Sequence, residues 1–236
     1  MEGELPGGHQ VQRRHAHGRA MGPEQAVGDS HAHVRRAHLG QHGIVGQFHQ
    51  GMDHGLGMHV HLSETKSEHD GCVARHGRTP AALFEQYGIF AVRAIAAHCV
   101  WTTEEDWALM AEKGVSCIHN PVSNLKLASG VAPVPRLLEA GVNVALGTDG
   151  VASNNSHDMF EEIKLAALLH KGISRDPTAV SARQALEMAT INGARALLDG
   201  HLYGSLEPGK KADLIVIDPY GPSMMPVHDK HGRPYH

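Results

Sequence analysis

Short apolar runs alternate with longer mixed stretches from residue 58 onward, and this alternation predicts a parallel α/β sheet. Four runs have the length and apolar content of strands: 58–62, 92–97, 115–118 and 142–146. The stretches between them are typical of helices: 65–75, 81–87, 102–113 and 133–140. Strands and helices in regular alternation, joined by right-handed crossovers, form a sheet of the βα class.

Helix ends in this region carry sequence signals of their own. Thr65 followed by Glu68 fits a capping box, and Thr102 followed by Glu105 fits another. The Thr-Pro pair at 79–80 is typical of a first helical turn. Glycines at 114 and 141 end two of the predicted helices.

The pattern changes after residue 150, where helices dominate. Residues 159–169 have apolar positions at helical spacing, and a capping box at 181–184 begins a helix that extends through 189 and on to 197. A turn-rich link at 204–209 follows. Residues 213–218 then fit a strand outside the βα rhythm, which predicts a small β element packed beside the main sheet.

Composition changes abruptly near residue 57. Residues 1–57 hold nine of the 21 histidines and 12 of the 27 glycines, without an apolar period of 3.6 or 2.0. Two interpretations stay open for this segment. One is a disordered, histidine-rich, metal-binding tail, and the other is an out-of-frame or wrongly started translation of a GC-rich gene. The abrupt start of patterned sequence favours the second interpretation.

Bulk charge and cysteine content argue for a small-molecule partner in a reducing compartment. The net charge of −4 and the pI near 6.6 give no general attraction to nucleic acid or anionic lipid. The three cysteines form no C-x-x-C pair, which argues against a disulfide framework. No apolar stretch approaches the roughly 18 residues of a membrane span, and no signal-peptide pattern begins the chain. We therefore expect a cytoplasmic protein, as a monomer or a homo-oligomer, that binds neither nucleic acid nor membranes.

Polar side chains follow all four predicted strands. They are His61 and Glu64, then His98, then His119, Asn120, Ser123 and Asn124, then Asp149, Ser153, Asn154 and Asn155. The carboxyl ends of parallel strands share one end of a barrel, and active sites lie there. Imidazole nitrogens and carboxylate oxygens converging from several strands are ligands of a catalytic divalent metal. A lone histidine at a strand end is usually structural, but four such ends in succession indicate hydrolytic metal chemistry.

Spacing within residues 59–64 separates the expected roles. If His61 leaves its strand toward a metal, Glu64 lies in the following loop, near the metal without binding it, where it can shuttle protons. The structural alternatives are a carboxylate at a helix N-terminus for Glu64 and a simple turn residue for Asp149. His59 is expected to point to the other side of the strand, so it is left out of the site.

Five segments together resemble the amidohydrolase superfamily. They are HVHLSET (59–65), AAHC (96–99), HNPVSNLKLASGVAPVPRLLEAGVNVALGTDGVASNN (119–155), MATINGARAL (188–197) and GSLEPGKKADLIVID (204–218). Within the superfamily they are most similar to the deaminases of 5′-methylthioadenosine and S-adenosylhomocysteine, over about residues 58–229. The combination of HNPVSNLKL with GTDGVASNN is highly specific, whereas the last segment is shared by many amidohydrolases.

This resemblance implies an architecture. The fold expected from it is α/β, the C-terminal half of a TIM (β/α)8 barrel with a strand of the flanking small β-sandwich domain. Barrel strands 5 to 8 and their helices would occupy residues 58–200. Residues 201–236 would return to the small β-domain and end in a tail, and residues 1–57 would be irregular.

The resemblance also implies a reaction, the hydrolytic deamination of an adenosine derivative to its inosine counterpart with release of ammonia. His61 and Asp149 would bind one divalent metal, zinc first, with iron or manganese as alternatives. The metal would activate a water, Asp149 would take its proton, and His98 would stabilise the oxyanion. Glu64 would protonate the purine ring. The implied contacts with this nucleoside substrate are Glu64, Asp149, Ser153 and Asn120.

One departure from the family pattern is on the N-terminal side. The family has a His-x-His pair after an apolar first strand, and the look-alikes at 15–17 and 31–33 follow no apolar run. The 27 residues between His33 and His61 cannot hold three βα units of about 30 residues each. The open interpretations are an incomplete copy of the enzyme, a non-catalytic remnant, or a half-barrel that needs a partner chain. The alternative activity is other amidohydrolase chemistry, on guanine, cytosine or s-triazine rings.

Overall fold

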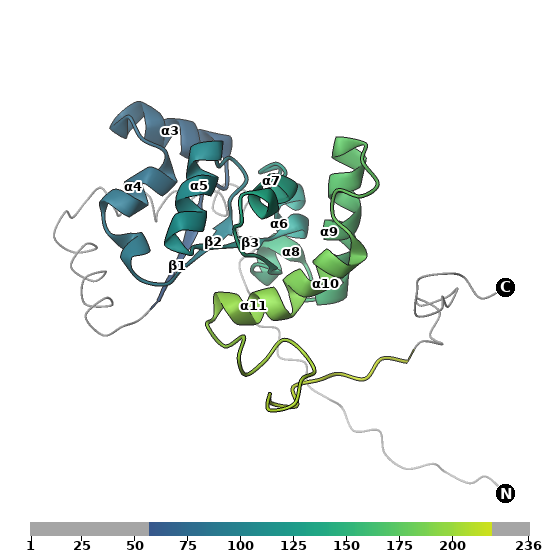
Figure 1. Ribbon diagram of the computed structural model, residues 1–236. Helices are drawn as coiled ribbons and strands as arrows, with labels where there is room; N and C mark the ends of the chain where they lie inside the picture. Colours follow the sequence, from purple (N-terminus) through teal and green to yellow (C-terminus); the bar gives the residue numbers. More distant parts are fainter. Residues whose placement is uncertain (1–56, 219–236) are drawn as a thin grey trace, which may run out of the picture. The chain divides into compact units, whose positions relative to one another are not determined.

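A four-stranded parallel sheet forms the centre of the described part of the chain (Figure 1). The computed structural model describes residues 57–218, so expectations for 1–56 and 219–236 lie outside the described residues. The strands are β1 (Met58–Leu62), β2 (Ala94–His98), β3 (Ser116–His119) and β4 (Val144–Leu146). Each strand pairs in parallel with the next one in the chain, as adjoining strands of a (β/α) barrel do. The predicted α/β class is confirmed.

Helices follow the strands as the pattern predicts. They are α3 (Lys66–His76), α4 (Pro80–Gln86), the 3-10 turn η1 (Ile89–Ala91), α5 (Glu104–Lys113), α6 (Pro121–Lys126), α7 (Val134–Glu139), α8 (Val151–Asn154), α9 (Met159–Ser174), α10 (Ala182–Ala189) and α11 (Ile191–Ala196). Every helix predicted from the sequence forms, although some ends differ. Within residues 57–218, no helix combines the length and the apolar character needed to cross a membrane.

Three segments differ from the predicted helices and loops. Residues 119–133, where the pattern predicts no helix, contain α6, and the turn after Asp149 continues into α8. The helix expected over 181–197 is interrupted at Thr190, whose φ and ψ of −128° and −95° are not helical. Both short helices in the expected loops lie at strand ends, and they therefore shape the region where polar side chains gather.

The strand predicted at 213–218 is not formed among the described residues. These residues join no ladder, and their apolar side chains are exposed, Ile215 at 73% and Val216 at 91%. A strand needs a neighbour to pair its amides and cover one face, and β-branched sequence alone supplies neither. No strand thus forms at 213–218 within residues 57–218, and the small β element stays a prediction.

Asp106 connects the beginnings of two helices. Its Oδ2 accepts from the N–H of Thr103, the N-cap of α5, at 2.9 Å, and the Thr103 hydroxyl accepts from the Asp106 N–H in return. Its Oδ1 accepts from the hydroxyl of Thr79, the N-cap of α4, at 2.5 Å. The capping box thus begins one residue later than predicted, because Asp106 and not Glu105 reaches back.

Two buried histidines connect helix α9 with strand β3. Nε2 of His170 lies 3.4 Å from Nε2 of His119, and the ring centroids are 5.3 Å apart. Burial lowers the pKa of His119 to about 3, an effect to which His170 and His98 add. Burial lowers the pKa of His170 to about 4. Both imidazoles are therefore neutral at pH 7, and the N–H of one donates a hydrogen bond to the bare nitrogen of the other.

Replacing Asp106 tests the link between the two helix starts. We expect Asp106→Ala to lower the free energy of unfolding by about 2–3 kcal/mol, because the Thr103 N–H and the Thr79 hydroxyl lose their acceptor in a site that is 2% exposed. Asp70→Ala is the matched control, since Asp70 pairs with Lys66 on an exposed face, and it should cost less than about 0.5 kcal/mol. Urea unfolding followed by circular dichroism measures both, and equal losses would contradict the interpretation.

Acid should destabilise the fold through the buried histidine pair. The pKa of each imidazole is 6.5 ordinarily and about 3 or 4 in the folded chain, so the unfolded chain binds protons first as pH falls. Stability is therefore full above pH 6.5 and declines toward pH 4, by on the order of 3 kcal/mol for each imidazole. His170→Gln should make this decline less steep. Unfolding free energies at several pH values measure the slope, and an unchanged slope in the variant would refute the assignment.

Candidate active site

Three of the predicted site residues meet at one end of the sheet. His61 lies near the end of β1, His98 is the last residue of β2, and Asp149 follows β4. A ring nitrogen of each histidine and a carboxylate oxygen of Asp149 all lie within 4.8 Å of one another. The two histidine rings are stacked, with centroids 5.3 Å apart and planes at 17°. Two imidazoles and a carboxylate this close together form a donor set for one divalent ion.

The backbone at these strand ends adopts left-handed conformations that residues other than glycine seldom have. The φ angle is 47° at Ser63, 72° at His98, 53° at Cys99 and 60° at Asp149. Each such residue costs of the order of 1–3 kcal/mol and persists only where its surroundings hold it. Here the Trp101 N–H donates to the Ser63 carbonyl at 2.9 Å, which joins the turn after β2 to the turn after β1. The turn that carries His98 is thereby held by its neighbour.

Electrostatics favour the metal-binding forms of two members of the donor set. Loss of hydration lowers the pKa of His61, and the neighbouring His98 lowers it further. Burial by itself would raise the pKa of Asp149, but hydrogen bonds from Ser123 and the Gly150 N–H, together with the nearby histidines, bring it below its ordinary value. At neutral pH, His61 thus offers a bare nitrogen and Asp149 an anionic oxygen.

Glu64 lies beside His98 and outside the donor set. Its Oε2 is 3.8 Å from His98 Nε2, and its side chain is 13% exposed. Its Oε1 accepts a hydrogen bond from the Ser129 hydroxyl at 3.2 Å. The carboxylate in the first turn of α3 is that of Glu68 and not that of Glu64, and its Oε2 accepts a hydrogen bond from the Glu64 N–H at 2.9 Å. Glu64 therefore occupies the loop position expected of it, with one oxygen directed toward His98.

One chain segment contacts His98, Glu64 and Asp149. We call residues 120–130, which include α6 and the turn after it, the platform segment. Its contacts are Ser123 Oγ with Asp149 Oδ2 at 2.6 Å, Asn124 Oδ1 with His98 Nδ1 at 2.8 Å, and Ser129 Oγ with Glu64 Oε1 at 3.2 Å. The three platform side chains are at most 5% exposed. Water therefore does not compete for these bonds. The orientation of each of the three side chains that the segment contacts depends on the platform residue to which it is bonded.

The turn at the end of the platform segment packs against the residues that follow β2. Trp101 Nε1 donates to the Ser129 carbonyl at 2.8 Å. Gly130 has a φ of 124°, and a Cβ at this position would lie 2.9 Å from Val100 Cγ1. Only glycine fits both the conformation and the close approach. The location of Ser129, and with it that of Glu64, is set by the loop that carries His98.

Asn120 supports the turn that carries Asp149. Its amide oxygen accepts from the Asp149 N–H at 3.2 Å, and its amide nitrogen donates to the Ile118 carbonyl at 2.6 Å. A Cβ at Gly147 would lie 3.2 Å from this amide and 2.7 Å from Ile118 Cγ2. The glycine that follows β4 thus makes room for the amide.

Glu162 is a buried carboxylate that the sequence did not single out. Its Oε1 accepts from Asn154 Nδ2 at 2.5 Å, and Asn154 also donates to the Thr148 carbonyl at 2.7 Å. Its Oε2 accepts from the Val122 N–H in α6 at 3.3 Å. Burial raises the pKa of Glu162, against these hydrogen bonds, which lower it. Glu162 connects α9 with both the platform segment and the Asp149 turn.

Ser153 and Asn120, the other two residues expected to contact substrate besides Glu64 and Asp149, flank the Asp149 turn. Ser153 lies in α8 and is half-buried. Asn120 is 4% exposed and uses its amide to hold backbone groups. Ser123 and Asn124 were named among the polar side chains at the strand ends without a predicted role, and Ser129 was not singled out. A detectable signal for Ser123 and Asn124 was their i+3 and i+4 spacing from Asn120, which brings them to the same side of the short helix that begins at Pro121.

The expectation for His59 was wrong. Side chains two residues apart on a strand lie on the same face. Accordingly, His59 and His61 are both exposed, whereas Leu62 is buried and Met58 and Val60 are half-buried. His59 shares the face of His61 but does not belong to the donor set.

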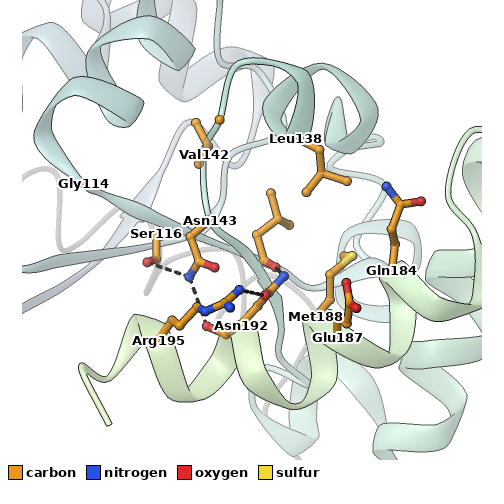
Figure 2. Close-up of a pocket in the computed structure, with 12 residues that line it drawn as sticks. Gly114, Ser116, Leu138, Val142, Asn143, Gln184, Glu187, Met188, Asn192 and Arg195 are labelled. Carbon is orange, nitrogen blue, oxygen red and sulfur yellow. Dashed lines mark hydrogen bonds between the residues drawn. The ribbon is translucent and has the colours of Figure 1, made fainter. Parts of the chain in front are cut away.

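A separate hollow of about 590 Å³ lies at the amino ends of β3 and β4 (Figure 2). It contains no histidine. Asn143 Nδ2 donates to Ser116 Oγ and to the Asn192 carbonyl, both at 3.0 Å, and Asn192 Nδ2 donates to the Val144 carbonyl at 2.9 Å. These bonds hold α11 against the sheet. The hollow lies at the opposite end of the strands from His61, His98 and Asp149.

The sequence is similar to two curated deaminases of modified adenosines. It is 56% identical over 175 residues to the 5-methylthioadenosine/S-adenosylhomocysteine deaminase of Moorella thermoacetica. The matched residues make up 74% of this chain and 41% of that protein. It is 52% identical over 175 residues to the 5′-deoxyadenosine deaminase of Methanosarcina acetivorans, with shares of 74% and 40%. The chain thus spans about two fifths of the length of these relatives.

A solved structure and a family model agree with these relatives. The fold resembles that of an adenosine deaminase from Xanthomonas campestris with bound zinc, at a TM-score of 0.74 and 42% identity over 78% of this chain and 43% of that one. A sequence model of the Amidohydrolase family matches residues 20–233, a range that includes every site residue described above. Since the match covers most of the sequence, the chain belongs to the amidohydrolase family.

Proposed function

We propose that residues 57–218 supply the acid-base and metal-binding residues of a hydrolytic deaminase that acts on 5′-modified adenosines. The observation that carries the proposal is the donor set of His61, His98 and Asp149 within 4.8 Å, with Glu64 3.8 Å from His98. The names of the two curated relatives support the substrate class. In the proposed reaction, oxygen from water replaces the amino group of the adenine ring, and ammonia leaves.

The proposed roles follow from the surroundings of each group. Asp149 is anionic and takes the proton of the attacking water. Glu64 gives a proton to the ring nitrogen through Oε2, because Ser129 occupies Oε1. His98 orients the water between these two carboxyl groups. Ser153 and Asn120, on either side of the Asp149 turn, are proposed to face the bound nucleoside.

A divalent metal, proposed to be zinc, belongs to this site. The residues present fit such an ion, because His61 and Asp149 are in their ligand forms and lie within reach of one another. When bound, the ion supplies Lewis acidity that lowers the pKa of a water molecule. Zinc is bound in the similar adenosine deaminase structure, which supports zinc over iron or manganese.

A chimera tests the proposed reaction. In the chimera, the 175 matched residues of the Moorella thermoacetica enzyme are replaced by those of this chain. Release of ammonia is measured with 5′-methylthioadenosine, S-adenosylhomocysteine and guanine. This chain without the Moorella residues is assayed in parallel. We expect the chimera to deaminate the two adenosine derivatives. Glu64→Gln should lower kcat by at least about 100-fold, because the ring nitrogen loses its proton donor.

The control for that chimera is Glu85→Gln, since Glu85 forms a surface pair with Lys113 and its replacement should leave kcat unchanged. A folded chimera that acts on guanine alone would overturn the substrate assignment. A folded chimera that keeps full activity after Glu64→Gln would overturn the role of Glu64.

Zinc binding tests the donor set without any activity. The histidine-rich sequence before residue 57 can bind zinc as well, so the quantity to measure is the difference in bound zinc between variants, by calorimetric titration of the whole chain. His61→Ala and Asp149→Ala should each remove one ion per chain, because the single proposed ligand that remains holds zinc weakly. His59→Ala is the matched control on the same face of β1 and should keep that ion. An equal loss in all three variants would contradict the assigned site.

A further inference from the structure

His98 has a hydrogen-bond partner that determines which of its nitrogens carries the proton. Its Nδ1 lies 2.8 Å from Asn124 Oδ1. An amide oxygen can only accept, so Nδ1 donates, and in the neutral ring Nε2 then carries the lone pair. Nε2 is also the nitrogen that lies 3.8 Å from Glu64 Oε2. The orientation of one amide therefore decides the chemical character of the nitrogen that faces the site.

The surroundings of Asn124 hold the amide in place. His98 and Asn124 are each 1% exposed, so water does not compete for their bond. The Asn124 N–H donates to the Asn120 carbonyl, and the Asn124 carbonyl accepts from the Ser129 N–H, both at 2.9 Å. The backbone of Asn124 is thus fixed on both sides within the platform segment.

The amide of Asn124 is only half satisfied. Its Nδ2 is buried and has no hydrogen-bond partner within residues 57–218. Leaving a buried donor unpaired lowers stability, and such groups call for an explanation other than stability. The amide oxygen bonds to His98 at the expense of the nitrogen. This arrangement is expected where the role of Asn124 is to present its amide oxygen as a hydrogen-bond acceptor to His98.

We propose that Asn124 is a positioning residue that fixes His98 as the Nδ1–H tautomer, so that a bare Nε2 faces His61 and Asp149. His98 then accepts a hydrogen bond from the attacking water and does not donate one to an oxyanion, in contrast to the role that the family resemblance implies. The identity of that water rests on the proposed function. The tautomer does not, because it follows from the contact of Asn124 with His98.

Nitrogen NMR of the whole chain reads the tautomer directly. The chain is labelled with 15N at histidine and kept free of metal and substrate, so the result is independent of whether the chain is a deaminase. Long-range proton–nitrogen spectra distinguish protonated from bare ring nitrogens, and His98→Gln identifies the signals of His98. We expect a protonated Nδ1 and a bare Nε2 in the unmodified chain. A protonated Nε2 with a bare Nδ1 would overturn the proposal.

Two substitutions separate positioning from packing. Asn124→Leu keeps the volume but removes the acceptor, and it should move the proton from Nδ1 to Nε2. Asn124→Asp keeps an acceptor and cannot donate, so Nδ1 should stay protonated. A proton that stays on Nδ1 in Asn124→Leu, or leaves it in Asn124→Asp, would overturn the proposal. If Asn124→Leu fails to fold, the aspartate variant still decides.

Asn143→Leu is the matched control. Asn143 is a half-buried amide at the other end of the sheet, bonded to Ser116 and Asn192 (Figure 2). Its loss should lower stability without moving the proton of His98. A change of tautomer in this variant would show that the His98 signal reports general loosening, and the proposal would fail.

Discussion

The site depends first on the parallel register of neighbouring strands. Leu62 pairs with His98 between β1 and β2, and His119 pairs with Leu146 between β3 and β4. This register brings the ends of all four strands to one edge of the sheet. A shift of one residue in β2 would turn His98 to the opposite face and separate it from His61. The bond from the Trp101 N–H to the Ser63 carbonyl joins two of these ends directly and opposes such a shift.

The platform segment adds a second constraint, because one stretch of chain holds groups that come from three different strands. Its hydrogen bonds reach Asp149, His98 and Glu64 from within a dozen residues. Movement of α6 would therefore disturb all three groups together, and their contributions cannot be treated as independent. Glu162 extends this connection to α9 through the Val122 N–H. A helix that contacts no reacting group thus shares in the geometry of the site.

Sequence reasoning found the residues at strand ends and missed those that hold them, and the difference has a physical origin. His61, His98 and Asp149 follow apolar runs, and a parallel sheet brings such positions together whatever the loops do. Ser129 and Glu162 act through contacts with residues far away in the chain, which no local period reveals. The strand expected at 213–218 does not form within residues 57–218 for the same reason, since its formation depends on a neighbour. Alternation could have placed His59 correctly, because a period of two puts it on the face of His61.

The composition of the donor set itself distinguishes catalysis from structural metal binding. A structural zinc site closes its tetrahedron with four protein ligands, whereas a catalytic site keeps one position for water. Residues 57–218 bring two imidazoles and one carboxylate within 4.8 Å, with His61 on an exposed face. Glu64, 3.8 Å from His98, has no part in that set, yet it is held in place by Ser129. A purely structural site has no use for a carboxyl group fixed next to its ligands. The arrangement is therefore consistent with the proposed function, in which a proton would be transferred beside a bound ion.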